Sequence, residues 1–141
     1  MCCRDIIKES ATNTAETNAH LLLVDDSPVA LAYLEAMFLG AGYSVDTATH
    51  GGEAFEKATR TVPNLVVTDG LMPDVDGYEL IRRLREHPGT AAVPVIMLTS
   101  ADAGDPEHLG RTPKPDAIIL KSMQFDPLLN EVKRLLMGRT A

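Results

Sequence analysis

Residues 21–26, Leu-Leu-Leu-Val-Asp-Asp, decide the fold of this 141-residue chain when they are set beside residues 65–69, Leu-Val-Val-Thr-Asp. Each segment is a short run of branched, mostly apolar residues that ends in acid. A run this apolar fits a strand that is buried on both faces, as in a parallel sheet covered by helices on either side. The two segments therefore predict two strands of an α/β domain.

The acids come just past the carboxyl ends of these predicted strands. In open α/β sheets ligands bind at that edge, so we expect Asp25, Asp26 and Asp69 to face one another across a crevice. Carboxylates packed this closely repel one another and require a cation. A hard divalent ion such as Mg²⁺, which takes oxygen ligands and keeps several waters, suits this chemistry.

Two further apolar runs supply the remaining groups of the predicted site. Residues 93–98 are followed by Thr99, a hydroxyl, and residues 117–120 are followed by Lys121, an ammonium. Together with the acids, these groups predict a site for a phosphoryl group on a carboxylate. Asp69 is the expected acceptor, because a carboxylate is a competent nucleophile when a metal and a lysine neutralise it and the incoming phosphoryl oxygens.

A set of motifs, taken in order and spacing, carries a family resemblance: Asp25-Asp26, residues 69–73 (Asp-Gly-Leu-Met-Pro) followed by Asp76-Gly77, Thr99-Ser100, and Lys121. No single motif is specific, but the whole series is. From about residue 21 to residue 137 the chain resembles the receiver domain of two-component response regulators, of the single-domain, chemotaxis-regulator-like type.

The resemblance implies a magnesium site with defined ligands. Asp26 and Asp69 would ligate Mg²⁺ directly, and Asp25 would act more through water. The backbone carbonyl of Leu71 would supply a further ligand.

The resemblance also implies the chemistry and the partners. Asp69 would take the phosphoryl group from a sensor histidine kinase or a phosphotransfer protein, while Thr99 and Lys121 would bind phosphoryl oxygens. Phosphorylation would then alter the affinity for a downstream protein target. Such a chain is not a dedicated enzyme, since it catalyses only its own phosphorylation from phosphodonors and its slow autodephosphorylation.

The order of elements predicts the architecture. Residues 1–18 lack sustained periodicity and are expected to form a flexible leader, and residues 19–141 are expected to form the receiver domain. Strands that alternate with helical segments predict an α/β, doubly wound, five-stranded parallel sheet with helices on both faces. The resemblance implies the flavodoxin-like strand order 2-1-3-4-5. Prolines and glycines in residues 101–115 predict a short or irregular fourth helix.

Two helices have predicted ends. Ser27 should cap a helix that begins at Pro28, with an inward apolar face made of Leu31, Leu34, Ala36, Met37 and Phe38. The last helix should begin at Asp126-Pro127 and end at Gly138.

Composition excludes several classes of function. With 20 acidic against 13 basic residues, the formal net charge is −7, which argues against direct nucleic-acid binding. No apolar stretch is long enough for membrane insertion, and the first residues lack the apolar core of a secretory signal. We therefore expect a cytoplasmic protein.

Departures from the family pattern keep an alternative open. Ile118 stands where receivers usually have an aromatic residue, Ser122 replaces a common proline, and the fourth helix is degraded. These departures favour a receiver-like module that binds proteins without phosphorylation, whereas the complete acid pocket disfavours it. A phosphatase of the haloacid dehalogenase class would need a second acid where Leu71 stands.

Overall fold

The computed structural model describes residues 19–70, 76–99, 113–121 and 126–140 of the chain. The strands are β1 His20–Val24, β2 Ser44–Ala48, β3 Leu65–Asp69, β4 Val95–Thr99 and β5 Ala117–Leu120. They form one sheet in the order β2-β1-β3-β4-β5, and every neighbouring pair is parallel. The predicted doubly wound sheet with the strand order 2-1-3-4-5 is confirmed.

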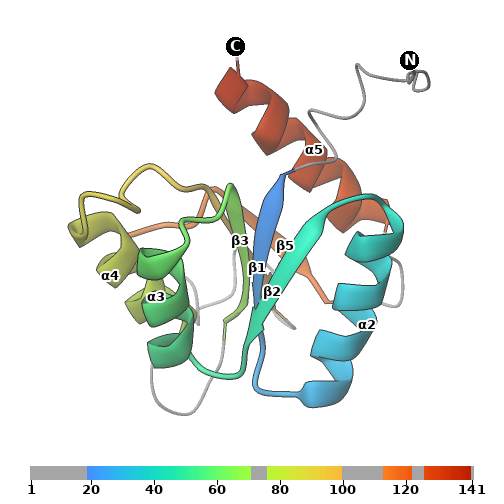
Figure 1. Ribbon diagram of the computed structural model, residues 1–141, viewed down its shortest axis with the longest axis horizontal. Coiled ribbons are helices and arrows are strands. Elements are labelled where there is room, and N and C mark those ends of the chain that lie inside the picture. Colours follow the sequence, from blue (N-terminus) through green and yellow to red (C-terminus); the bar gives the residue numbers. More distant parts are fainter. Residues whose placement is uncertain (1–18, 71–75, 100–112, 122–125, 141) are drawn as a thin grey trace, which may run out of the picture.

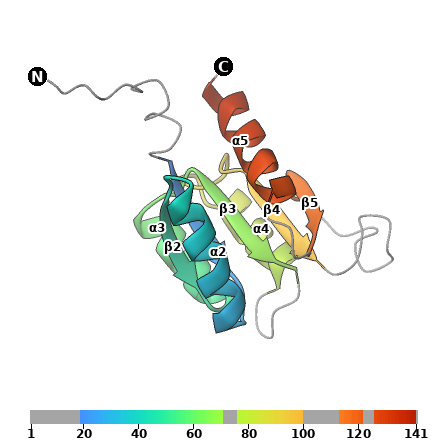
Figure 2. The same cartoon turned by 90° about the vertical axis from the view of Figure 1, so that its right-hand side faces the viewer.

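Helices cover both faces of this sheet (Figures 1 and 2). They are α2 Pro28–Gly40, α3 Gly51–Arg60, α4 Gly77–Glu86 and α5 Asp126–Thr140. The side chains of α3 and α4 pack on one face, and those of α2 and α5 pack on the other. The central strands are therefore shielded from water on both sides, as their apolar sequences predict.

Strand β1 contributes side chains to the hydrophobic cores on both faces of the sheet. Leu21 and Leu23 pack with α2 and α5, whereas Leu22 and Val24 pack with α3 and α4. Successive side chains of a strand point to opposite faces, so an uninterrupted apolar run is needed to fill two cores.

The start of α2 matches its predicted cap. The Ser27 hydroxyl accepts a hydrogen bond from the Ala30 N–H over 3.3 Å, and Pro28 follows in the first turn. The helix ends at Gly40, and the chain turns at Gly42, whose φ of 99° favours glycine. This cap fixes the turn between the Asp25-Asp26 pair and α2.

The predicted inward face of α2 is only partly right. Leu31, Leu34 and Phe38 are buried, but Ala36 and Met37 are exposed. Residues two apart lie about 200° apart around a helix, so Ala36 points away from the face that carries Leu34 and Phe38. The chain thus leaves apolar residues of α2 in solvent.

The predicted end of α5 was wrong, because the helix continues past Gly138 to Thr140. A glycine inside a helix costs only about 1 kcal/mol relative to alanine, so it does not by itself end a helix. The predicted leader in residues 1–18, and residues 101–112 of the predicted irregular helix, lie outside the described residues. Across the described ranges, no helix combines the length and the apolar character needed to cross a membrane.

Candidate functional site

The predicted site residues meet at the carboxyl edge of the sheet. Asp25 directly follows β1, Asp69 ends β3, Thr99 ends β4, and Lys121 directly follows β5. Parallel pairing aligns these ends, since Asp69 is in register with Leu98 of the next strand. The topology therefore brings together side chains that are far apart in the sequence.

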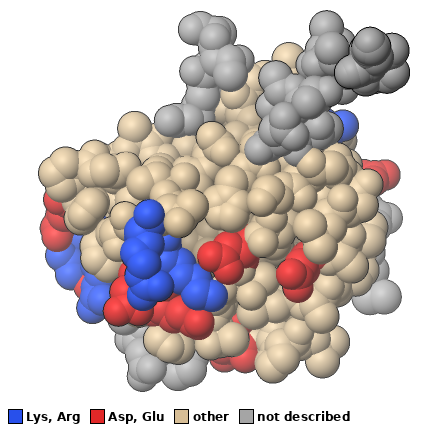
Figure 3. All heavy atoms as spheres, in the orientation of Figure 1, with Lys and Arg blue, Asp and Glu red and all other residues tan. Residues whose placement is uncertain are grey.

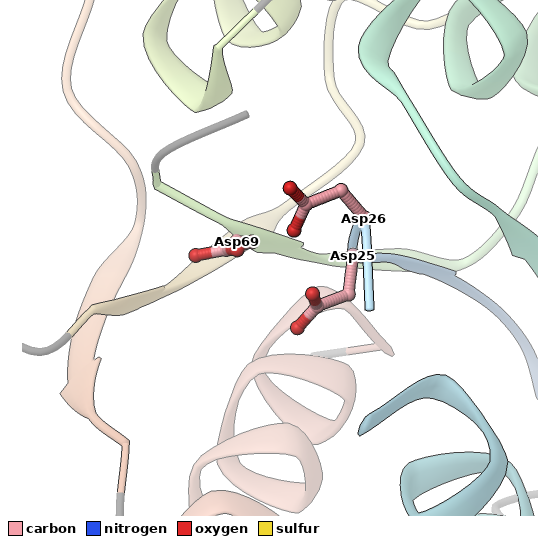
Figure 4. Close-up of side chains that lie close together, drawn as sticks. All are labelled: Asp25, Asp26 and Asp69. Atoms are coloured by element: carbon pink, nitrogen blue, oxygen red, sulfur yellow. The ribbon is translucent and has the colours of Figure 1, made fainter. Parts of the chain in front are cut away.

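The acids form a compact cluster (Figure 4). One carboxylate oxygen from each of Asp25, Asp26 and Asp69 lies within 4.8 Å of the others. Asp25 is 2% exposed and Asp69 is 7% exposed, whereas Asp26 lies open to solvent. In the part of the chain that the structure describes, no other group of acidic, histidine or cysteine side chains meets the same geometry.

Lys121 joins two of the acids. Its Nζ lies 3.3 Å from Asp69 Oδ1 and 3.5 Å from Asp25 Oδ2. The Lys121 N–H donates to the Thr99 carbonyl over 2.7 Å, which sets the lysine beside the end of β4. The ammonium thus enters the cluster from the side of β5.

Two hydrogen bonds with main-chain groups hold Asp25 in place. Its Oδ1 accepts the Ser27 N–H over 2.9 Å, and its backbone N–H donates to the Ala48 carbonyl over 3.1 Å. These two bonds fix both the main chain and the carboxylate, and they leave Oδ2 directed toward Lys121. The acid is therefore placed before any ligand arrives.

The electrostatics of the cluster call for more positive charge. Burial raises the pKa of Asp25, and the charge of Asp69 adds to the rise, although the Ser27 N–H and Lys121 act against it. Burial alone would lower the pKa of Lys121, but Asp25 and Asp69 outweigh it and raise that pKa. One ammonium therefore faces a cluster of carboxylates, two of which are buried.

The residues that are present fit a hard divalent cation. The cluster offers oxygen ligands from carboxylates, which are the groups that Mg²⁺ prefers in proteins. Asp26 keeps an open side to water, and Mg²⁺ commonly retains several waters. Leu71, the remaining predicted ligand, lies outside the described residues.

Thr99 lies where the prediction put it, as a buried residue at the end of β4. Sequence reasoning missed two other residues. Ser27 was predicted only as a helix cap, yet its N–H also binds Asp25. Thr68 was assigned no role, although a hydroxyl in an otherwise apolar strand directly before Asp69 is a feature of the sequence that could have indicated one.

Two proteins of known name are similar to this chain in sequence. Over 120 residues the chain is 31% identical to the protein PilH of Pseudomonas aeruginosa, covering 85% of this chain and 99% of PilH. It is 38% identical over 122 residues to the gliding motility regulatory protein of Myxococcus xanthus, covering 86% of this chain but only 16% of that protein.

A solved structure shares the fold. The receiver domain of a sensor histidine kinase from Pseudomonas aeruginosa, with a magnesium ion coordinated in its active site cleft, superposes with a TM-score of 0.76. The two are 28% identical, and the match covers 84% of this chain and 98% of that one. The response regulator receiver domain family matches residues 21–133. The chain therefore belongs to the family of response regulator receiver domains.

Proposed function

We propose that this chain is a phosphoacceptor receiver that takes a phosphoryl group on Asp69 with Mg²⁺ and signals through altered protein binding. The observation that carries the proposal is the position of Lys121 beside the acid cluster. Its Nζ lies 3.3 Å from Asp69 Oδ1, and one carboxylate oxygen from each of the three acids lies within 4.8 Å of the other two. A structural lysine would need only one acid. Lys121 instead pairs with both Asp25 and Asp69, in a cluster that could hold a metal ion, and this position suits a lysine that binds an incoming phosphoryl group.

The proposed reaction is a transfer between a histidine donor and a carboxylate. A carboxylate oxygen of Asp69 attacks phosphorus, and the bond from phosphorus to the donor imidazole nitrogen breaks. The imidazole leaves with the bonding electron pair, and the product on Asp69 is an acyl phosphate. Lys121 supplies an ammonium and Thr99 supplies a hydroxyl. Both groups donate hydrogen bonds that stabilise the negative charge on the phosphoryl oxygens.

Asp25, Asp26 and Asp69 are the described residues that would hold Mg²⁺, and Leu71 is proposed to add its carbonyl. When bound, the ion neutralises charge on the acids and on the phosphoryl group. The magnesium ion in the receiver from Pseudomonas aeruginosa supports this assignment. Lys121 alone cannot balance the cluster, because it carries a single charge.

An exposed face of α2 suits the phosphoryl donor. Val29, Tyr33 and Met37 are 80%, 46% and 36% exposed, and their four-residue spacing aligns them along the helix. Glu35 is the only charged residue in α2. The helices α3, α4 and α5 instead carry ion pairs on their surfaces, and Figure 3 shows charged atoms gathered over α3 and α4.

This apolar face of α2 continues to the pocket. The helix starts two residues after Asp26, and the Ser27 N–H at its cap binds Asp25. An amphipathic helix can bury its apolar stripe on such a face. We infer that the donor lays a helix along α2, which would bring its phosphohistidine to Asp69.

One observation favours the alternative, a protein-binding module that works without phosphorylation. Ile118 of β5 is half-buried against the core formed by α3 and α4, where the family usually has a movable ring. The acid cluster favours the phosphoacceptor, because a pure binding module has no need of buried, mutually repelling carboxylates.

Intact-mass measurement after incubation with Mg²⁺ and acetyl phosphate tests the proposal. The wild-type chain should gain one phosphoryl group, and both chelation of Mg²⁺ and Asp69→Asn should prevent the gain. Asp46→Asn is the matched control, since Asp46 is a partly exposed acid on β2 that pairs with Lys57. No gain in the wild-type chain would favour the binding module.

A further inference from the structure

Thr68 is a buried polar residue that the proposed chemistry does not use. It lies in β3 directly before Asp69 and is 0% exposed. Its Oγ1 donates to the main-chain carbonyl of Asp69 over 3.0 Å. A buried hydroxyl without a partner is destabilising, so this bond holds the side chain and the carbonyl to each other.

The peptide unit after Asp69 is held as well. The Gly70 N–H donates to the Leu98 carbonyl over 3.0 Å, and the Gly70 carbonyl accepts the Gly77 N–H over 3.2 Å. The first of these bonds ties the peptide between residues 69 and 70 to β4, and the second ties Gly70 to the first residue of α4. Together with Thr68, they fix the main chain on both sides of the bond between residues 69 and 70.

Gly77 brings α4 against the same carbonyl. A Cβ added at Gly77 would lie 2.8 Å from the Asp69 carbonyl oxygen and 2.8 Å from Met97 Cε. Real Cβ atoms do not come so close to backbone, so any larger residue would force α4 and β3 apart. The Asp69 carbonyl thus receives the Thr68 hydroxyl and packs against the glycine.

We propose that Thr68 and Gly77 are positioning residues for the phosphoacceptor. They hold the Asp69 main chain so that its carboxylate stays in the acid cluster, with Oδ1 3.3 Å from Lys121 Nζ. Neither residue touches the phosphoryl group. The inference rests on the proposed function, because the orientation of Asp69 matters only if its carboxylate reacts or binds metal.

Paired threonine variants test the hydroxyl. Thr68→Val removes it at nearly constant volume, and Thr68→Ser keeps it. Thr90→Val is the matched control, because Thr90 is also 0% exposed and donates from Oγ1 to a main-chain carbonyl, that of Leu84, over 2.7 Å. Thr90 precedes β4 and so lies at the opposite edge of the sheet from Asp69.

With saturating Mg²⁺ and acetyl phosphate, Thr68→Val should be phosphorylated at least tenfold more slowly, because small misplacements of reacting groups cost large factors in rate. Thr68→Ser should recover most of the rate. Thr90→Val should lower the melting temperature and leave the rate unchanged. Equal rates for Thr68→Val and Thr90→Val would overturn the inference.

A glycine pair provides the second test. Gly77→Ala should slow phosphorylation, whereas Gly52→Ala should not. Gly52 also lies in the first turn of a helix, but a Cβ there would meet only the His50 ring, at 3.5 Å. A normal rate in Gly77→Ala would remove Gly77 from the proposal.

A measurement without donor separates this inference from the proposed function. In amide NMR spectra of the metal-free chain, Thr68→Val should shift the Gly70 and Gly77 resonances and Thr90→Val should not. Thr68→Val should also weaken Mg²⁺ binding. If the wild-type chain takes no phosphoryl group, the proposed function fails, but these spectra still decide the positioning role. Unshifted Gly70 and Gly77 resonances in Thr68→Val would overturn it.

Discussion

The Ser27 N–H donates to Asp25 Oδ1 over 2.9 Å, so the most buried acid of the cluster shares a hydrogen bond with the cap of α2. The bond orients Asp25 without neutralising it. Burial and the charge of Asp69 still raise the pKa of Asp25 above the ordinary value of 3.8. The chain therefore keeps an acid in a place that disfavours its charge.

Asp25→Asn should raise the melting temperature of the metal-free chain at pH 7. The pKa of Asp25 is higher in the folded than in the unfolded state, so the protonated acid favours folding. This contribution to the free energy of unfolding is fully present below pH 3.8 and is lost as the pH rises through the pKa of the folded state. Asp25 therefore contributes less to the stability of the folded chain at pH 7 than it does at low pH. Asparagine keeps an oxygen for the Ser27 N–H and carries no charge.

Thermal unfolding of Asp25→Asn at several pH values, without Mg²⁺, checks this prediction. The gain in melting temperature should shrink as the pH falls toward 3.8, where the wild-type acid is protonated. Asp26→Asn is the control, since Asp26 is exposed and should give a smaller gain. A lower melting temperature for Asp25→Asn at pH 7 would contradict the prediction.

Mg²⁺ binding should weaken on acidification, because protons compete with the ion for the carboxylates. The raised pKa of Asp25 brings this competition closer to neutral pH. Asp26→Asn should weaken binding by about tenfold or more and Asp25→Asn by less, if Asp26 is a direct ligand and Asp25 acts through water. Calorimetric titration at several pH values measures both effects. Equal losses in the two variants would remove this ranking.

The apolar face of α2 should matter for a protein donor and not for a small one. Val29→Glu should slow phosphotransfer from a histidine kinase that phosphorylates the wild-type chain, by roughly tenfold or more if Val29 is a central contact. Phosphorylation by acetyl phosphate should be unchanged. Val62→Glu is the matched control, because Val62 is 47% exposed in the turn between α3 and β3, away from α2. Equal effects of the two substitutions would argue against docking on α2.

Ile118 should stay in place when the site is filled. A β-branched side chain has few accessible rotamers, and Ile118 packs against the core on the α3 and α4 side of the sheet. With Mg²⁺ and beryllofluoride as a phosphoryl mimic, the Ile118 methyl resonances should report an unchanged rotamer. A rotamer change would show that this position switches without an aromatic ring.

The sheet and the acid cluster were predictable from the sequence because each depends on local pattern. Apolar runs such as residues 21–24 fit a doubly covered strand, and parallel strands bring their carboxyl ends to one edge. The sequence alone therefore assigns Asp25, Asp69 and Lys121 to one pocket.

What the sequence did not predict depends on the angle and closeness of packing. Met37 fits an apolar pattern, but only the orientation of α2 on the sheet shows that it faces solvent. The approach of Gly77 to the Asp69 carbonyl depends on where α4 begins relative to β3, which no pattern of residues specifies. Helix ends such as that of α5 are set by small energies, and a single glycine does not decide them.

The most direct test of the central claim is to locate the phosphoryl group. Borohydride reduces an acyl phosphate on aspartate to homoserine, so peptide mass spectrometry after phosphorylation and reduction identifies the acceptor. The account predicts homoserine at position 69 only when Mg²⁺ and acetyl phosphate were both present, with Asp25 and Asp26 unmodified. Homoserine at position 25 or 26, or a phosphorylated chain with Asp69 intact, would contradict it.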